Sequence, residues 1–253
     1  MKYFTEEQSI VRQIWGKADS ILFIFAGAAA EFAVNKAVDW LYFTGKLPAD
    51  PLGRLFSTVV YARQIIFSEM EDANRALEKI TAIHQGVEKA RGAQIPDWAY
   101  RDVLFMLIDY SIRSFEILYR KLSDAEKLEI FDVFYRVGAG MKIKDLPQNY
   151  ADWQLIREAQ MDADMINSDF TIDLYEQYRK HLGPVRYLIL KQVQVLLVPK
   201  QVNQLLSLGN TPYLLPWLLA YKASRAVKLD EALIFSVLPD EYREQVKNLS
   251  AGE

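Results

Sequence analysis

Residues 50–58 read Asp-Pro-Leu-Gly-Arg-Leu-Phe-Ser-Thr, and residues 83–87 read Ile-His-Gln-Gly-Val. The first segment predicts the start of a helix, because Asp50 can cap a free backbone N–H and Pro51 has none to lose. Within that helix Arg54 and Thr58 are four residues apart and therefore share one face. A cation and a hydroxyl on one face, with a histidine on the next helix, suit a pocket for an anionic cofactor.

The helical pattern extends outward from these segments through nearly the whole chain. Ser123, followed three residues later by Glu126, marks another helix start, and Gly92 marks an end. The sequence shows neither sustained strand-like alternation nor two-residue hairpin turns. We therefore predict an all-α fold, with helices over residues 6–17, 20–42, 51–68, 70–91, 98–121, 124–138, 149–163, 168–181, 184–207, 212–226 and 239–248.

A chain of 253 residues can bury a substantial core, and no linker or internal repeat divides it. Residues 103–108 and 187–198 are apolar on more than one helical face, which is typical of helices that are buried or that line an apolar cavity. We predict one large all-α domain over residues 1–253 that encloses a cavity for a cofactor or an apolar ligand.

Composition narrows the class of protein further. The chain is 51% hydrophobic and 25% charged, and its formal net charge of −3 argues against nucleic acid as the main partner. Cysteine is absent, which excludes disulfides and thiolate ligands and fits the cytoplasm best. The longest apolar run, residues 21–30, is too short for a bilayer span of about twenty residues, and we expect neither a transmembrane segment nor a secretory signal.

The pattern Asp-Pro-x-x-Arg-x-x-x-Thr, followed on the next helix by Ile-His-x-x-Val, resembles the haem-dependent MpaB/latex-clearing-protein oxygenase family, also called DUF2236. The resemblance covers roughly residues 20–200. It implies an all-α haem b protein that uses dioxygen or peroxide to oxidise an apolar small molecule, isoprenoid-like or polyene. It also implies that His84 is the axial ligand of the haem iron.

The residues themselves leave more than one interpretation of this site open. His84 shares an apolar stripe with Leu77, Ile80 and Val87, as expected of a proximal haem ligand and equally of a core histidine bonded to a carbonyl. The other histidine, His181, ends a predicted helix, where its charge favours the helix dipole.

Two further residues of the first segment have expected roles at a haem. Arg54 suits a haem propionate, because a guanidinium can bind a carboxylate through two hydrogen bonds, although it could also pair with a nearby acid such as Asp50. Thr58 either donates to a propionate or to bound oxygen, or bonds back to the carbonyl of Arg54.

The sequence also departs from the family pattern. A lysine that can precede the motif threonine in latex-clearing members is Ser57 here, and a glycine common two residues after the motif valine is Lys89. The Tyr-x-x-x-Asp-Pro element is present only in part at residues 98–103, where Val103 replaces the proline. These departures concern the distal side and the substrate more than the histidine ligand.

Oxygen activation needs an acid or base on the distal side, and two carboxylates are candidates. Glu31 interrupts the apolar residues 28–34, which suggests a paired or functional carboxylate. Asp39 lies eight residues later on the same predicted helix, nearer the position of the family's distal acid. Alternatively, either residue marks the solvent edge of the helix.

Other chemistries lack the residues that they require. The chain has no Gly-x-Ser-x-Gly or Walker A pattern, and two distant histidines cannot build a zinc site. A di-iron bundle is excluded because Thr81 and Tyr178, rather than glutamates, precede the histidines by three residues. Two alternatives to an oxygenase stay open: a haem-binding or haem-sensing protein without turnover, and a non-haem carrier of apolar ligands.

Overall fold

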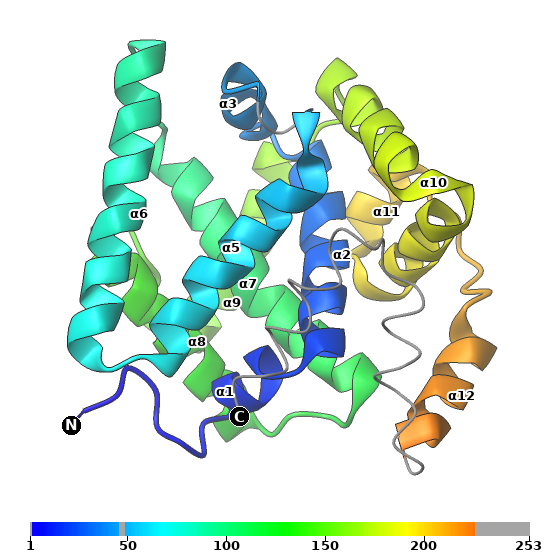
Figure 1. The fold of residues 1–253 in the computed structure, drawn as a ribbon, viewed down its shortest axis with the longest axis horizontal. Coiled ribbons are helices and arrows are strands. Elements are labelled where there is room, and N and C mark those ends of the chain that lie inside the picture. The colour runs from blue at the N-terminus through cyan, green and yellow to red at the C-terminus, as the bar shows by residue number, and fades with distance from the viewer. Residues whose placement is uncertain (1, 46–48, 226–253) are drawn as a thin grey trace.

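The computed structural model describes residues 2–45 and 49–225, and over these residues its regular secondary structure is helical, without a strand (Figure 1). The predicted all-α fold is confirmed, and the described helices form one domain. In chain order they are α1 (Ile10–Trp15), α2 (Ala18–Val34), α3 (Val38–Phe43), α5 (Pro51–Phe67), α6 (Met70–Arg91), α7 (Asp97–Leu118), α8 (Asp124–Gly140), α9 (Tyr150–Asp164), α10 (Asp169–Leu197), α11 (Lys200–Leu206) and α12 (Leu215–Ser224).

The centre of the molecule is the pair α2 and α7, with α10 packed against the other side of α2. The two helices approach closely at Gly27, where a Cβ atom would lie 2.3 Å from the ring of Tyr110. A larger residue at position 27 would therefore force the helices apart. This close crossing explains why α2 can be buried along most of its length.

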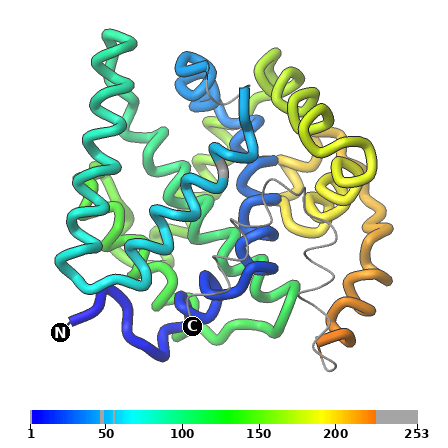
Figure 2. The backbone as a smooth tube through the Cα atoms, in the orientation of Figure 1, coloured from blue at the N-terminus to red at the C-terminus, as the bar shows by residue number. Residues whose placement is uncertain are grey.

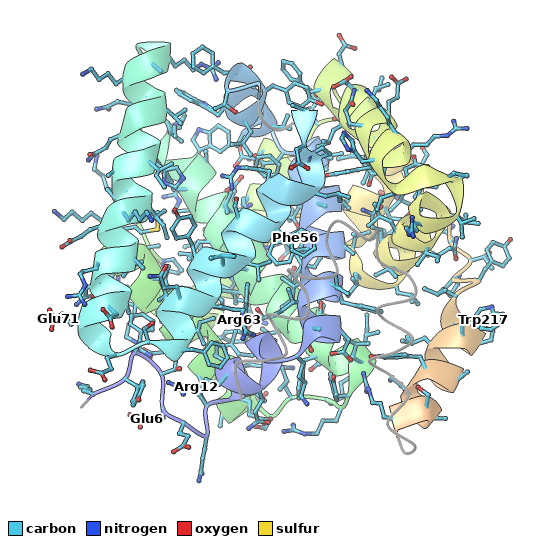
Figure 3. The ribbon with its side chains drawn as sticks, viewed as in Figure 1. Glu6, Arg12, Phe56, Arg63, Glu71 and Trp217 are labelled. Carbon is cyan, nitrogen blue, oxygen red and sulfur yellow. The ribbon has the colours of Figure 1, made fainter. Side chains whose placement is uncertain are left out.

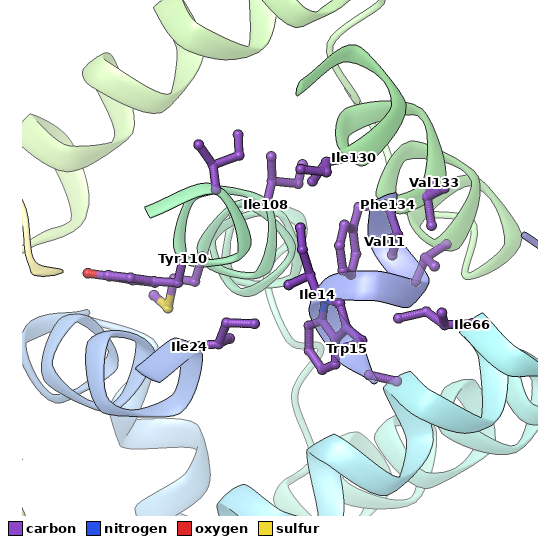
Figure 4. Close-up of a cluster of buried hydrophobic side chains, with 14 of the residues drawn as sticks. Val11, Ile14, Trp15, Ile24, Ile66, Ile108, Tyr110, Ile130, Val133 and Phe134 are labelled. Atoms are coloured by element: carbon purple, nitrogen blue, oxygen red, sulfur yellow. The ribbon is translucent and has the colours of Figure 1, made fainter. Parts of the chain in front are cut away.

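A hydrophobic core forms where α1, α2, α5, α7 and α8 meet (Figure 4). Ile14 and Trp15 of the short helix α1 are fully buried there, and the indole Nε1 of Trp15 donates to Ser111 Oγ at 3.1 Å. Burying side chains of this size stabilises the fold by roughly 1.5–3 kcal/mol each. The core therefore anchors the N-terminal half of the chain around α1.

The predicted helix over residues 20–42 is wrong in its continuity, because it breaks at Asn35 into α2 and α3. Asn35 has extended backbone angles, and its Oδ1 accepts from the N–H of Ala37 at 2.7 Å while its Nδ2 donates to Asp102 at 2.7 Å. These side-chain bonds compete with the helical backbone pattern. As a result, Glu31 and Asp39 lie on different helices.

The C-terminal helices also differ from their predicted bounds. Residues 169–197, labelled α10, are two helical segments that meet at Gly183, whose φ of 72° and ψ of 170° are not helical and which precedes Pro184. The predicted break between residues 181 and 184 is therefore present. The predicted helix over 184–207 is interrupted after Leu197, because Pro199 cannot continue it, and residues 200–206 form α11. The predicted helix over 239–248 lies outside the described residues. None of the helices in the described part of the chain combines the length and apolar character needed to cross a membrane.

Helices α5 and α6 form a hairpin that meets at residues 68–69 and opens toward its other end (Figure 2). The start of α5 is capped as predicted, since the N–H of Gly53 donates to Asp50 Oδ1 at 2.8 Å. At the far end of α6, Gly92 takes the left-handed conformation, with φ of 71°, and ends the helix. The N-terminal part of α5 and the C-terminal part of α6 thus both lie away from the hairpin turn.

Candidate functional site

The histidine of α6 has a buried nitrogen that no described residue satisfies. The predicted stripe is present, with Leu77 buried, Ile80 packed against the core and His84 half-buried. Nδ1 of His84 is shut off from solvent and makes no hydrogen bond, and the ring meets Tyr100 edge-on with 5.1 Å between ring centroids. A core histidine bonded to a carbonyl would show the bond that is missing here.

The surroundings of His84 favour its neutral form. Burial and, to a lesser extent, the positive charge of Arg54 lower the pKa of His84 to about 4, while the negative charge of Glu88 acts in the opposite direction. The imidazole is therefore neutral at physiological pH, which is the form that binds a metal.

Arg54 is a partly buried cation whose side chain donates hydrogen bonds only to hydroxyl groups among the described residues. Its Nη1 donates to Ser57 Oγ at 3.0 Å and to Thr58 Oγ1 at 3.2 Å, and burial lowers its pKa. No ion pair joins it to any carboxylate within the described ranges. A desolvated guanidinium with this set of partners suits an anionic ligand.

Thr58 makes the local bond that was one of its two predicted roles. Its Oγ1 donates to the carbonyl of Arg54 at 3.4 Å, and Ser57 Oγ donates to the same carbonyl at 2.7 Å. Both hydroxyls also accept from the guanidinium, so they fix the position of the Arg54 side chain from the same helix.

Two polar residues of α6 that the sequence reasoning missed extend the face that carries His84. Glu88 and Arg91 follow His84 by four and seven residues, the spacing of neighbours on one helical face. Glu88 Oε1 accepts from the hydroxyl of Tyr100 at 3.2 Å and from the N–H of Ile95 at 2.9 Å. Glu88 therefore fixes both the turn into α7 and the aromatic ring that contacts His84. The helical spacing alone could have identified both residues.

Asp39 of α3 lies at this same face of α6. Its Oδ2 accepts from Nη2 of Arg91, and the guanidinium of Arg91 lies 4.1 Å from the ring centroid of Trp40. The Asp39 side chain is 46% exposed. Of the two predicted acids, Asp39 is thus the one that the structure brings to the helix face of His84.

Glu31 lies in a different part of the molecule and is fully buried. Its two carboxylate oxygens receive both Nη atoms of Arg157 at 2.5 Å, and Oε2 also accepts from the hydroxyl of Tyr110 at 2.9 Å. Nη2 of Arg157 also donates to Asp109 Oδ2 at 3.1 Å, while Nε of Arg157 has no partner among the described residues. Among the described residues no interaction links Glu31 to His84, and we interpret this network as a connection between α2, α7 and α9.

The donor set indicates which kind of metal centre these residues could hold. In the parts of the chain that the structure describes, no three His, Cys, Asp or Glu side chains gather as a metal site. A haem needs only one axial ligand from the protein and cationic or hydroxyl partners for its propionates. A neutral His84 with a free nitrogen, beside Arg54, fits that requirement.

The enclosed cavity remains a prediction. Two surface hollows of about 530 and 440 Å³ lie elsewhere, the first between α1, α7 and α12 and the second between α8 and α9.

Comparison with known proteins supplies an independent finding. The family model described as "ER-bound oxygenase mpaB/B'/Rubber oxygenase, catalytic domain" matches residues 12–247, a range that includes both segments quoted at the outset. The match confirms the family resemblance. Searches of curated proteins and of solved structures gave no match.

Proposed function

Because the chain belongs to the MpaB/rubber-oxygenase family of oxygenase catalytic domains, we propose that it is a haem b-dependent oxygenase. Its substrate would be an apolar small molecule, isoprenoid-like or polyene, which it oxidises with dioxygen or peroxide. The observation that supports this proposal best is the buried Nδ1 of His84, unsatisfied beside a cation without an acidic partner. Leaving such a polar atom buried and unbonded costs about 1–3 kcal/mol, which a ligand would offset.

Residues of α5, α6 and α7 would together hold the cofactor. His84 would ligate the iron, and Arg54, oriented by Ser57 and Thr58, would bind a propionate. Tyr100, held by Glu88, restricts the orientation of the imidazole ring. When bound, the haem would supply the binding and activation of oxygen.

Of the two predicted acids, Asp39 is the one that we propose moves a proton. Its Oδ2 is bound to Arg91, while Oδ1 has no partner among the described residues. Oδ1 would therefore accept or return the proton, as general acid–base catalysis requires. Glu31, whose oxygens are both bound, is the weaker candidate for this role.

The first test is a haemin titration of the full chain, followed by absorption spectra of the oxidised and dithionite-reduced protein. We expect one haem per chain and a Soret band. His84→Ala should lose this haem, whereas His181→Ala, which alters the other histidine of the chain, should keep it. A His84→Ala variant with a full haem complement would contradict the ligand assignment. Wild-type protein that takes up no haemin would leave the carrier of apolar ligands as the better proposal.

The second test separates an oxygenase from a haem sensor by measuring oxygen consumption with a soluble polyene. Asp39→Asn should keep its haem and lose turnover by roughly 10²-fold, the usual contribution of a general acid or base. Asp132→Asn is the matched control, because Asp132 makes a comparable exposed ion pair with Arg136 on α8. Equal turnover in Asp39→Asn and wild type would exclude Asp39, and haem without any turnover would favour the sensor.

A further inference from the structure

Helix α12 and the residues before it expose a concentration of large apolar side chains. Residues 213–219 read Tyr-Leu-Leu-Pro-Trp-Leu-Leu. Trp217 is 73% exposed, Tyr213 72%, Leu219 59% and Leu215 43%. Leu218 is the buried residue of this helix. A helix that is apolar on all sides is normally enclosed by a core or by lipid, and α12 is not enclosed by the described protein.

The side chain at the centre of this segment points away from the protein. Figure 3 shows Trp217 projecting outward from α12 at the edge of the molecule. Tryptophan and tyrosine have an apolar body and a polar N–H or O–H, and they are enriched at the boundary between headgroups and acyl chains of a membrane. Their exposure here matches that environment.

The charge distribution along the sequence gives a second, independent observation. Residues 177–229 contain eight lysines and arginines and no aspartate or glutamate, although the whole chain is acidic. The other 200 residues hold 22 basic and 33 acidic side chains, a net charge of −11. The exposed apolar residues of α12 therefore belong to the single long positively charged part of the sequence.

We propose that α12, with Tyr213 before it, docks on the surface of a membrane that contains anionic lipids. Trp217, Leu215 and Leu219 would enter the boundary of the headgroups and acyl chains. Lys222 in the last turn of α12 would contact the headgroup phosphates. The helix would lie in the membrane plane, because its ten residues are too few to cross the bilayer.

Charge distinguishes this occupant from a second copy of the chain. A two-fold symmetric dimer through α12 would bring the same patch of each subunit together, and with it two acid-free, positively charged segments. Two positively charged segments that face each other oppose association of the subunits, whereas an anionic bilayer attracts the positively charged segment of each subunit. The proposal does not depend on haem or on the proposed activity.

The test is co-sedimentation of the full chain with vesicles of phosphatidylcholine alone or with added phosphatidylserine. We expect binding to the anionic vesicles that weakens as salt is raised, with a blue shift of tryptophan emission. The double variant Trp217→Ser/Leu219→Ser should bind about tenfold more weakly. Leu155→Ser is the matched control, since Leu155 is 69% exposed on α9 and should leave binding unchanged.

Three results would overturn the proposal. The first is an absence of binding to the anionic vesicles, and the second is equal binding by wild type and the double variant. The third is a dimer, measured by light scattering, that the double variant abolishes, since this would show that α12 is a contact between two copies. Circular dichroism of both variants checks that each is folded. We expect both to fold, because the substituted residues are exposed and surface substitutions usually change stability little.

Discussion

Two clusters of charged side chains in this molecule differ in whether the buried cation faces a carboxylate. Around Glu31 and Arg157, both carboxylate oxygens and both Nη atoms have partners, and the group is almost wholly buried. Around His84 and Arg54, a buried ring nitrogen has no hydrogen bond and the guanidinium has only hydroxyl partners. In the first cluster the charge of Arg157 faces two carboxylates, although its Nε has no hydrogen-bond partner among the described residues. In the second cluster the charge of Arg54 faces no carboxylate among the described residues.

The difference shows why burial and charge alone do not identify a functional site. Glu31 is the more deeply buried acid and is more conspicuous in the sequence, yet its bonds are all made within the fold. Removing one partner of such a complete pair is costly, because a buried charge is left behind. Removing a residue from an incomplete cluster should instead change ligand binding more than stability. Substitutions of Glu31 and of Arg54 test this distinction, and a substitution of Asp102 tests a buried acid outside both clusters.

The largest loss of stability is expected from Glu31→Gln. Gln cannot compensate the charge of Arg157, so the free energy of unfolding should fall by about 3–5 kcal/mol, measured by urea denaturation. The control is Glu71→Gln, since Glu71 is 85% exposed in its pair with Arg75 and should change stability by less than about 1 kcal/mol. Equal, small changes in both variants would show that the buried network is not structural.

An effect that depends on pH is expected from Asp102→Asn. Asp102 is buried and accepts a hydrogen bond from Asn35, and burial raises its pKa to about 7. Between about pH 4 and pH 7 the folded protein therefore holds a proton that the unfolded chain releases. The contribution of Asp102 to stability is present below this range and is lost as the pH rises through 7, by at most about 1.4 kcal/mol per pH unit.

Urea denaturation of wild type and Asp102→Asn at several values between pH 4 and 8 isolates this contribution. Wild type should lose stability relative to the variant as the pH rises, and the difference should level off above pH 7. A difference that stays constant with pH would mean that Asp102 is ionised throughout in the folded protein.

The sequence predicted the elements of the site better than the contacts within it. The cap at Asp50 and the shared face of Arg54 and Thr58 follow from spacing within one helix, and both are present. The break at Asn35 could not be predicted, because it depends on Asp102, which is 67 residues away in the sequence. Spacing within a helix is a local property, whereas the partner of a buried polar group is set by tertiary packing.

The same limit explains the two predicted acids. Glu31 was conspicuous because it interrupts an apolar run, but its partner Arg157 comes from α9 and is distant in the sequence. Asp39 was predicted on the helix of Glu31, and the break at Asn35 instead places it on α3, against Arg91. Neither pairing could be derived from spacing along the chain.

The smallest change in stability, and the most direct test of the comparison, is expected from Arg54→Met. In the ligand-free protein this substitution removes a desolvated cation that has no ion pair among the described residues. Ser57 and Thr58 keep their bonds to the backbone carbonyl at position 54. Stability should therefore change by less than about 1 kcal/mol. Affinity for haemin should fall at least about tenfold, because the bond to a propionate is lost.

Arg63→Met on the same helix should give the opposite result. Arg63 donates to the carbonyl of Trp15 at 2.5 Å and lies over the ring of Phe67, so it is engaged within the protein (Figure 3). We expect this variant to lose about 1 kcal/mol of stability and to keep its haemin affinity. If both arginine variants lost stability and neither lost haemin, the clusters of Arg54 and Glu31 would be alike. The proposal that the cluster around His84 and Arg54 binds haem would then be wrong.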